Sequence, residues 1–173
     1  LELNIKKKLN SFTLEINCNL NSNRIGILGG SGAGKSIILK MIAGIEKPDS
    51  GYIKLDGKLL FDSQKKIDIK PQDRHIGYCF QNYALFPHLS VYENIVIGLN
   101  SDNKSLADKF LEKFELTQIK DAKPNMISGG QAARVAMARI LIRKPKALLF
   151  DEAYSALDIY LRDHIQEEIS AIL

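Results

Sequence analysis

A glycine-rich loop between an apolar run and an amphipathic helix constrains this chain more than any other feature. The run RIGIL, residues 24–28, leads into GGSGAGKS, residues 29–36, and then into KSIILKMIAGI, residues 35–45. Glycine loses more backbone freedom on folding than any other residue, so such a loop needs a purpose. We expect 24–28 to be a buried strand and 35–45 to be a helix. The apolar face of that helix comprises Ile37, Ile38, Met41, Ile42 and Ile45.

The purpose that the loop fits best is phosphate binding. It matches G-x-x-x-x-G-K-S/T, in which backbone N–H groups surround phosphate oxygens, the lysine reaches the outer phosphates and the hydroxyl holds Mg²⁺. A helix N-terminus also favours an anion. We therefore predict a nucleoside triphosphate site; the alternative is a glycine-rich turn with an incidental lysine. The predicted binding residues are Gly29, Gly30, Ser31, Gly32, Ala33, Gly34, Lys35 and Ser36.

Composition narrows the remaining function classes. The 173 residues suit about one domain, and the formal charge of +4 is spread over lysine clusters without aromatic interleaving. A solvated surface explains these lysines better than nucleic-acid binding. Cys18 and Cys79 form no CxxC pair and are expected to be buried thiols. With no signal peptide and no bilayer-length apolar run, we expect a soluble chain that is able to dock on a membrane protein.

Alternation and helical spacing predict the order of the other elements. Residues 1–8 and 12–20 are expected to form an antiparallel strand pair, and 52–61 two short strands around Asp56 and Gly57. A polar loop, 63–75, precedes a strand at 76–80. Helices are predicted at 90–99, 104–116, 129–144 and 159–173, with a strand at 146–151 before the last of them.

Two acids at the end of an apolar strand form the second candidate site. In ALLFDE, residues 147–150 would form a buried parallel strand, with Asp151 and Glu152 at its carboxyl end. Asp151 is expected to hold the Mg²⁺ water shell, and Glu152 to orient and deprotonate an attacking water. The alternative is a helix start with acids in its first turn.

The segment ISGGQ, Ile127 to Gln131, opens a helix and forms a second candidate anion site through Ser128, Gly129, Gly130 and Gln131. Here the chain resembles the ATP-binding cassette family, whose signature is LSGGQ; Ile127 replaces the leucine. Gln81 resembles the Q-loop glutamine, ALLFDE the Walker B strand and SALD, residues 155–158, the D-loop. These motifs occur in the family's order over essentially the whole chain. The alternative for ISGGQ is a simple helix cap.

The resemblance implies an α/β fold of the P-loop NTPase class: a parallel core sheet, an N-terminal antiparallel β subdomain and an inserted α-helical subdomain, incomplete at the C-terminus. Residues 1–173 would be one nucleotide-binding domain. Its core and β subdomain would comprise 1–81 and 145–173, and its helical signature subdomain 82–144.

The resemblance also implies a mechanism that needs two chains. Two cassettes pair head to tail, with ATP between the glycine-rich loop of one and residues 128–131 of the other. Gln81 and Glu152 would be catalytic, and Ser36, Gln81 and Asp151 would hold Mg²⁺. The segment after Gln81 would contact a helix of a membrane permease that receives solute from a binding protein. The chain would then lie peripherally on the cytoplasmic face of the membrane.

Two longer segments suggest a subfamily. Residues 80–99 resemble importer cassettes, and residues 60–81 are most similar to molybdate-type oxyanion importers. Sulfate, ferric iron and polyamine importers are the alternatives. ATP hydrolysis would energise uptake of an oxyanion, with molybdate as the expected solute.

The chain also departs from the family pattern. Ala153 stands where a proline is usual, Ala132 and Ala133 replace polar residues, and Leu9 aligns with the adenine-stacking aromatic while Phe12 is expected in the core. The family's switch histidine would follow Leu173, and the last predicted helix ends in mid-pattern at SAIL without a stop signal, so we expect the chain to be a fragment. The alternative is a nucleotide-binding module that does not hydrolyse ATP.

Overall fold

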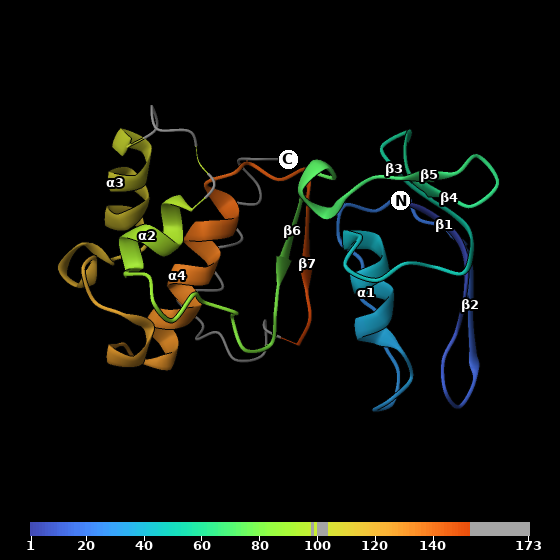
Figure 1. The fold of residues 1–173 in the computed structure, drawn as a ribbon, viewed down its shortest axis with the longest axis horizontal. Helices are drawn as coiled ribbons and strands as arrows, with labels where there is room; N and C mark the ends of the chain where they lie inside the picture. Colours follow the sequence, from blue (N-terminus) through green and yellow to red (C-terminus); the bar gives the residue numbers. More distant parts are fainter. Residues whose placement is uncertain (98, 100–103, 153–173) are drawn as a thin grey trace. The chain divides into compact units, whose positions relative to one another are not determined.

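The computed structural model describes residues 1–97, 99 and 104–152, and the chain divides into two compact units between Ile76 and Gly77. Figure 1 shows strands and helices in both units. The fold is of the mixed α/β class predicted for a P-loop NTPase. Each unit is described below by itself.

The first unit contains a five-stranded antiparallel sheet in the order β2-β1-β3-β4-β5. The alternation in the first two strands buries Leu3 and Ile5 on one face, and Ile5 pairs with Ile16 in the β1–β2 register. This confirms the predicted antiparallel pair. The strands are β1 Glu2–Lys8, β2 Thr13–Asn19, β3 Ser50–Leu55, β4 Lys58–Asp62 and β5 Ile67–Asp68.

The predicted turn at Asp56 and Gly57 joins β3 to β4. Both residues have positive φ, 46° and 78°. Such a pair matches the right-handed twist of a two-residue hairpin, and Asp-Gly is a favoured sequence for it. The residues 63–75, predicted as a polar loop, also contain the short strand β5 and the 3₁₀ helix η1, Pro71–Asp73.

Helix α1, Lys35–Ala43, follows the glycine-rich loop and buries Ile38, Met41 and Ile42. It ends at Gly44, whose φ of +82° few side chains tolerate. The guanidinium of Arg74 lies against this glycine and donates to the carbonyls of Met41 and Ile42, 2.8 Å each. A Cβ at Gly44 would lie 2.6 Å from Arg74 Nε, so both the backbone angle and the close approach require glycine.

The second unit pairs strand β6, Ile76–Cys79, with β7, Ala147–Phe150. The amide of Asp151 donates to the carbonyl of Cys79 at 3.1 Å, so the carboxyl ends of the two strands meet and the strands run parallel. The pair confirms both predicted strands and brings the acids after β7 to the end of β6.

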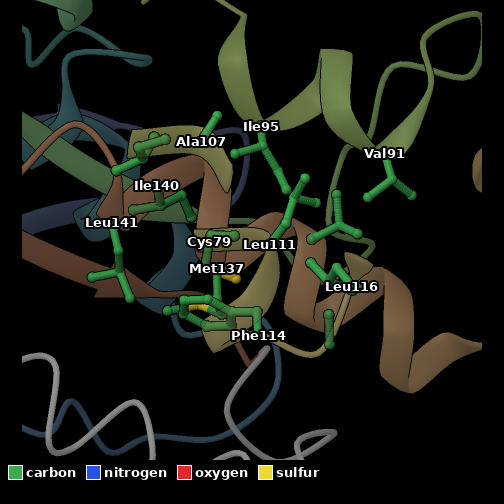
Figure 2. Close-up of a cluster of buried hydrophobic side chains, with 14 residues drawn as sticks. Cys79, Val91, Ile95, Ala107, Leu111, Phe114, Leu116, Met137, Ile140 and Leu141 are labelled. Carbon is green, nitrogen blue, oxygen red and sulfur yellow. The ribbon is translucent and has the colours of Figure 1, made fainter. Parts of the chain in front are cut away.

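Helices and 3₁₀ turns account for the rest of this unit. They are α2 Val91–Val96, α3 Lys104–Lys113, η3 Thr117–Ile119, η4 Pro124–Met126 and α4 Gly129–Leu141. The three α-helices confirm three of the predicted helices, and each ends about three residues before its predicted end. Figure 2 shows their shared core, in which Ile95, Leu111 and Met137 are each at most 2% exposed. None of the helices that the structure describes is long and apolar enough to span a bilayer.

Four sequence-based expectations are wrong. Residues 24–28 form no strand, and Leu28 is 96% exposed, because the segment is not paired with the five-stranded sheet of its own unit. Ile45 is exposed because α1 already ends at Gly44. Phe12 lies at a hairpin tip rather than in the core, and Cys18 is only half-buried on the edge strand β2. The helix expected at 159–173 and SALD lie outside the described residues.

Candidate active site

The glycine-rich loop ends in a helix N-terminus that has no side-chain cap. Gly34 is the N-cap of α1 in the left-handed conformation, with φ +92°, and makes no side-chain cap hydrogen bond. The first N–H groups of a helix have no acceptor within the helix, and the helix dipole adds positive potential there. An anion in front of Gly34 would satisfy both conditions.

Lys35 folds back over this loop. Its Nζ donates to the carbonyls of Gly29 and Gly30, at 2.9 Å each. We predicted that this lysine reaches the outer phosphates, and its ammonium now rests on neutral acceptors of the same loop. A phosphate is a stronger, charged acceptor, so a bound nucleotide would draw the lysine from these carbonyls.

An aromatic ring lies beside the same loop. A Cβ built on Gly34 would lie 3.4 Å from Leu14 Cδ1 and 3.8 Å from Phe12 Cζ, so the β1–β2 hairpin packs on the helix cap. The hairpin is closed by the bond from the Leu9 amide to the Phe12 carbonyl, 2.8 Å. The Phe12 side chain is 39% exposed and therefore offers an accessible apolar surface next to the loop.

The acid pair lies at the carboxyl ends of β6 and β7. Tyr78 on β6 donates from its hydroxyl to Asp151 Oδ2 at 2.8 Å. Burial and the neighbouring carboxylate raise the pKa of Tyr78, which keeps this hydroxyl protonated as a donor. Glu152 is exposed and has φ +57°. A left-handed non-glycine residue is strained, and such strain is concentrated at functional sites.

Mg²⁺ suits the predicted donor set. The hydroxyl of Ser36, the amide oxygen of Gln81 and the carboxylate of Asp151 are hard oxygen ligands, and Mg²⁺ in nucleotide sites takes only one or two carboxylates besides phosphate and water. Among the described residues no three His, Cys, Asp or Glu side chains form a metal-binding cluster. That these residues share one ion is a prediction.

Gln81 lies in a turn directly after β6. The amide of Tyr83 donates to the carbonyl of Phe80 at 3.0 Å and closes this turn around Gln81 and Asn82. Gln81 is exposed. Cys79, the last residue of β6, is buried. Desolvation raises the pKa of its thiol to about 11, so Cys79 is not a nucleophile at neutral pH.

The segment ISGGQ forms a capping box at the start of α4. Ser128 Oγ accepts from the amide of Gln131 at 3.2 Å, and Gln131 Oε1 accepts from the amide of Ser128 at 2.9 Å. The helix cap considered as the alternative is therefore present. A cap does not exclude an anion site, because Gly129 and Gly130 are exposed and a Cβ on either would meet no described atom within 4 Å.

Sequence reasoning missed three polar side chains around these residues: Tyr78, Asn94 and Arg139. Asn94 is fully buried and bonds to the segment after Gln81, and Arg139 donates to two carbonyls of that segment. A signal was available for Arg139, because an arginine between Ala138 and Ile140 interrupts the apolar part of its helix. A half-buried cation needs acceptors nearby.

Comparison with known proteins shows extensive similarity. Residues 9–155 match the family model described as ABC transporter. A "Probable sulfate/thiosulfate import ATP-binding protein" of Chlorella vulgaris is 44% identical over 94% of the chain, and a spermidine/putrescine import ATP-binding protein of Haemophilus influenzae is 41% identical over 95%. A molybdate/tungstate import ATP-binding protein of Archaeoglobus fulgidus is 39% identical over 98%.

The chain covers different shares of these relatives. It spans 70% of the sulfate and molybdate/tungstate relatives but only 43% of the polyamine relative. Among solved structures, a dimeric ATP-binding cassette in a post-hydrolysis state with ADP and Pi superposes with a TM-score of 0.75 at 28% identity. That match covers 96% of this chain and 79% of the other.

Proposed function

The chain belongs to the ABC transporter family, whose ATP-binding domains are ATPases, and from this premise we propose that it energises an importer by hydrolysing ATP. The observation that carries the proposal is the acid pair after β7. Asp151 is held by Tyr78 at the strand end, and the next residue, Glu152, has an exposed side chain on a strained backbone. One carboxylate for the metal and one for the attacking water is what hydrolysis requires.

The roles of the chain's own residues follow from their chemistry. The amides of the glycine-rich loop and Lys35 bind the β- and γ-phosphates, and Ser36, Gln81 and Asp151 hold the ion. Mg²⁺, when bound, neutralises charge that develops on the phosphoryl oxygens. Glu152 accepts a proton from the attacking water, and Gln81 orients that water toward the γ-phosphate.

We propose a head-to-tail pair of cassettes as the working unit. The helix N-termini of α1 and α4 are both candidate anion sites, and one nucleotide needs only the first from its own chain. Residues 128–131 of one chain would then close the ATP bound at the loop of its partner. The solved relative with ADP and Pi is dimeric, which supports this arrangement.

The substitution Glu152→Gln tests the function. It keeps the size and hydrogen-bonding capacity of the side chain and removes the base, so turnover should fall by at least about 100-fold while nucleotide binding persists. Asp73→Asn, an acid-to-amide change in η1 of the first unit, is a matched control that should leave turnover unchanged. If the wild-type protein, with Asp151 and Glu152 intact, releases no phosphate, the hydrolysis-deficient alternative is supported instead.

The finer proposal concerns the solute. We propose an oxyanion, with molybdate first, because residues 60–81 are most similar to molybdate-type importers and two of the relatives described above are named for sulfate and for molybdate/tungstate. The polyamine relative, at comparable identity, represents the competing solute class. Deleting the gene and measuring uptake of molybdate, sulfate and spermidine separates them; molybdate uptake at the wild-type rate would contradict our assignment.

Import also needs membrane partners. We propose that the chain lies on the cytoplasmic face of the membrane against permease subunits, which receive the solute from a binding protein. The exposed Phe86 and the polar residues after it belong to the segment that importer cassettes are expected to present to the permease. Copurification of the full-length protein with its permease checks this placement.

A further inference from the structure

We propose that Arg139 positions Gln81 for hydrolysis by bracing the strained segment that follows it. This inference rests on the proposed ATPase function, in which Gln81 orients the attacking water. Arg139 itself does not touch the nucleotide in this proposal. It acts through the backbone of Tyr83 and Ala84, the second and third residues after Gln81.

The segment after Gln81 is strained at two consecutive positions. Tyr83 has φ +60° and Ala84 has φ +43°, and neither is glycine. The amide of Ala84 donates to the carbonyl of Asn82 at only 2.7 Å, which makes the turn unusually tight. Left-handed conformations are strained for a non-glycine residue. The segment therefore needs compensating interactions in order to keep this conformation.

Arg139 supplies these interactions at the two strained residues themselves. Its Nη2 donates to the carbonyl of Tyr83 at 2.7 Å, and its Nη1 donates to the carbonyl of Ala84 at 2.8 Å. The guanidinium also lies over the ring of Phe86, 5.6 Å from its centroid. Short charge-assisted bonds of this kind are roughly twice as strong as neutral ones. One side chain thus fixes three residues of the segment.

The brace is rigid because helix α4 is rigid. Arg139 stands between Ala138 and Ile140, which are 0% and 9% exposed, and Figure 2 shows Ile140 and Met137 of this helix inside the hydrophobic core. Burial lowers the pKa of Arg139, but an arginine stays charged at any physiological pH. A well-packed helix holds the fork of the guanidinium in one place.

A second side chain holds the far end of the segment. Asn94 on α2 is fully buried; its Oδ1 accepts from the amide of Phe86 at 2.8 Å, and its Nδ2 donates to the carbonyl of Phe86 at 3.1 Å. Nδ2 also lies 3.2 Å from the Leu89 carbonyl and 3.0 Å from that of Ser90. Arg139 is therefore the brace nearest to Gln81, and Asn94 fixes the part beyond Phe86.

Gln81 lies between two fixed points. On one side is strand β6, and on the other is Tyr83, whose amide closes the turn on Phe80 while its carbonyl is held by Arg139. If Arg139 is lost, the strained residues relax and the exit of the turn shifts. A displacement of about 1 Å in a catalytic group costs on the order of 100-fold in rate. Nucleotide affinity depends on the glycine-rich loop and should change little.

The full-length protein and three variants test the inference. In Arg139→Met the stem remains and the donors are lost, in Arg139→Lys one donor group remains, and Arg143→Met is the matched control. Arg143 lies four residues further along and donates to the carbonyl of Ile97 at 3.1 Å. For each protein we would measure kcat for ATP, the Kd of a fluorescent ATP analogue and the midpoint of thermal unfolding.

We expect R139M to lower kcat by roughly 100-fold with Kd within about twofold, R139K to lower it by roughly tenfold, and R143M to match the wild type. The double variant R139M/A84G should recover at least about fivefold in kcat, because glycine adopts positive φ without cost. If R139M does not fold, R139K and A84G in its background give the same test.

The outcomes separate two failures. If the wild type hydrolyses no ATP, the proposed function is wrong and this inference is wrong with it. If the wild type hydrolyses ATP and a folded R139M or R139K keeps the wild-type kcat, only the inference is overturned. The inference is also overturned if R143M lowers kcat as much as R139M does, or if A84G restores no activity to R139M. Either result would assign Arg139 a general structural role.

Discussion

The two helix N-termini proposed to bind phosphate are built in opposite ways. At α1 the cap is Gly34, a left-handed residue without a side-chain cap, and Lys35 rests on carbonyls of its own loop. At α4 the cap is Ser128, and Ser128 and Gln131 satisfy each other's backbone amides. The first site has no side-chain cap, whereas the second is capped by its own side chains. We infer that nucleotide binding reorganises the first and docks on the second.

The largest effect that this difference predicts is at Lys35. In Lys35→Ala the loop loses its ammonium, and bonds of a charged donor to phosphate contribute about 1.5 to 3 kcal/mol each. We expect ATP to bind at least about 100-fold more weakly, measured by titration with a fluorescent analogue. Thermal unfolding should change little, because the bonds of Lys35 to Gly29 and Gly30 are solvent-exposed.

The control for this change lies on the same helix. Lys40 is in the last turn of α1, away from the loop, and Lys40→Ala should leave ATP affinity within about twofold. If both alanine variants weaken binding equally, the effect comes from net charge or helix stability. The first N-terminus would then not be the ligand-dependent one.

An intermediate effect is expected at Ser128, where the cap and the anion site can be separated. Ser128→Ala removes the acceptor of the Gln131 amide and should cost about 1 kcal/mol of unfolding free energy. Ser128→Asp keeps an N-cap acceptor and should be as stable as the wild type. Its carboxylate would repel phosphate, so ATP-dependent dimerisation should be lost in S128D.

Size-exclusion chromatography with ATP in a Glu152→Gln background measures that dimerisation, and denaturant unfolding measures the stability. An S128D protein that still dimerises with ATP would show that the second N-terminus is only a helix cap. In that case the comparison between the two sites would reduce to a difference in local helix structure.

Local sequence patterns predicted most of the helices and strands. The 3.6-residue spacing of Ile38, Met41 and Ile42 predicted α1, and alternation predicted the β1–β2 pair, because both signals are local and their apolar faces find partners in the same unit. The segment 24–28 has an equally apolar sequence, yet it forms no strand in the described part of the chain. A strand depends on a neighbour that supplies its hydrogen bonds, and no local pattern contains that neighbour.

The candidate site was also predictable only where it depends on local sequence. Motif spacing identified the glycine-rich loop and the acids after β7, since these functions depend on residue type and order. It did not identify the positive φ of Tyr83 and Ala84 or the carbonyls that Arg139 binds. Those features depend on where a distant helix places one guanidinium. Hydrophobicity alone predicts Phe12 in the core, whereas its place at a hairpin tip depends on how β1 and β2 pair.

The smallest predicted effect tests this last position. Phe12 is exposed and packs beside Gly34, a place from which an aromatic ring can stack on a nucleotide base, whereas Leu9, which aligns with the family's stacking aromatic, has no ring. Stacking by a partly exposed ring contributes about 0.7 kcal/mol, so Phe12→Ala should weaken ATP binding roughly threefold. The same substitution should leave the binding of inorganic triphosphate, which has no base, unchanged. Leu9→Ala is the matched control, and ATP affinity measured beside that of inorganic triphosphate separates stacking from a change in the loop. If F12A weakens both ligands equally, its contact with Gly34 supports the loop rather than the base, and the first site then depends on its hairpin as much as the second depends on its capping box.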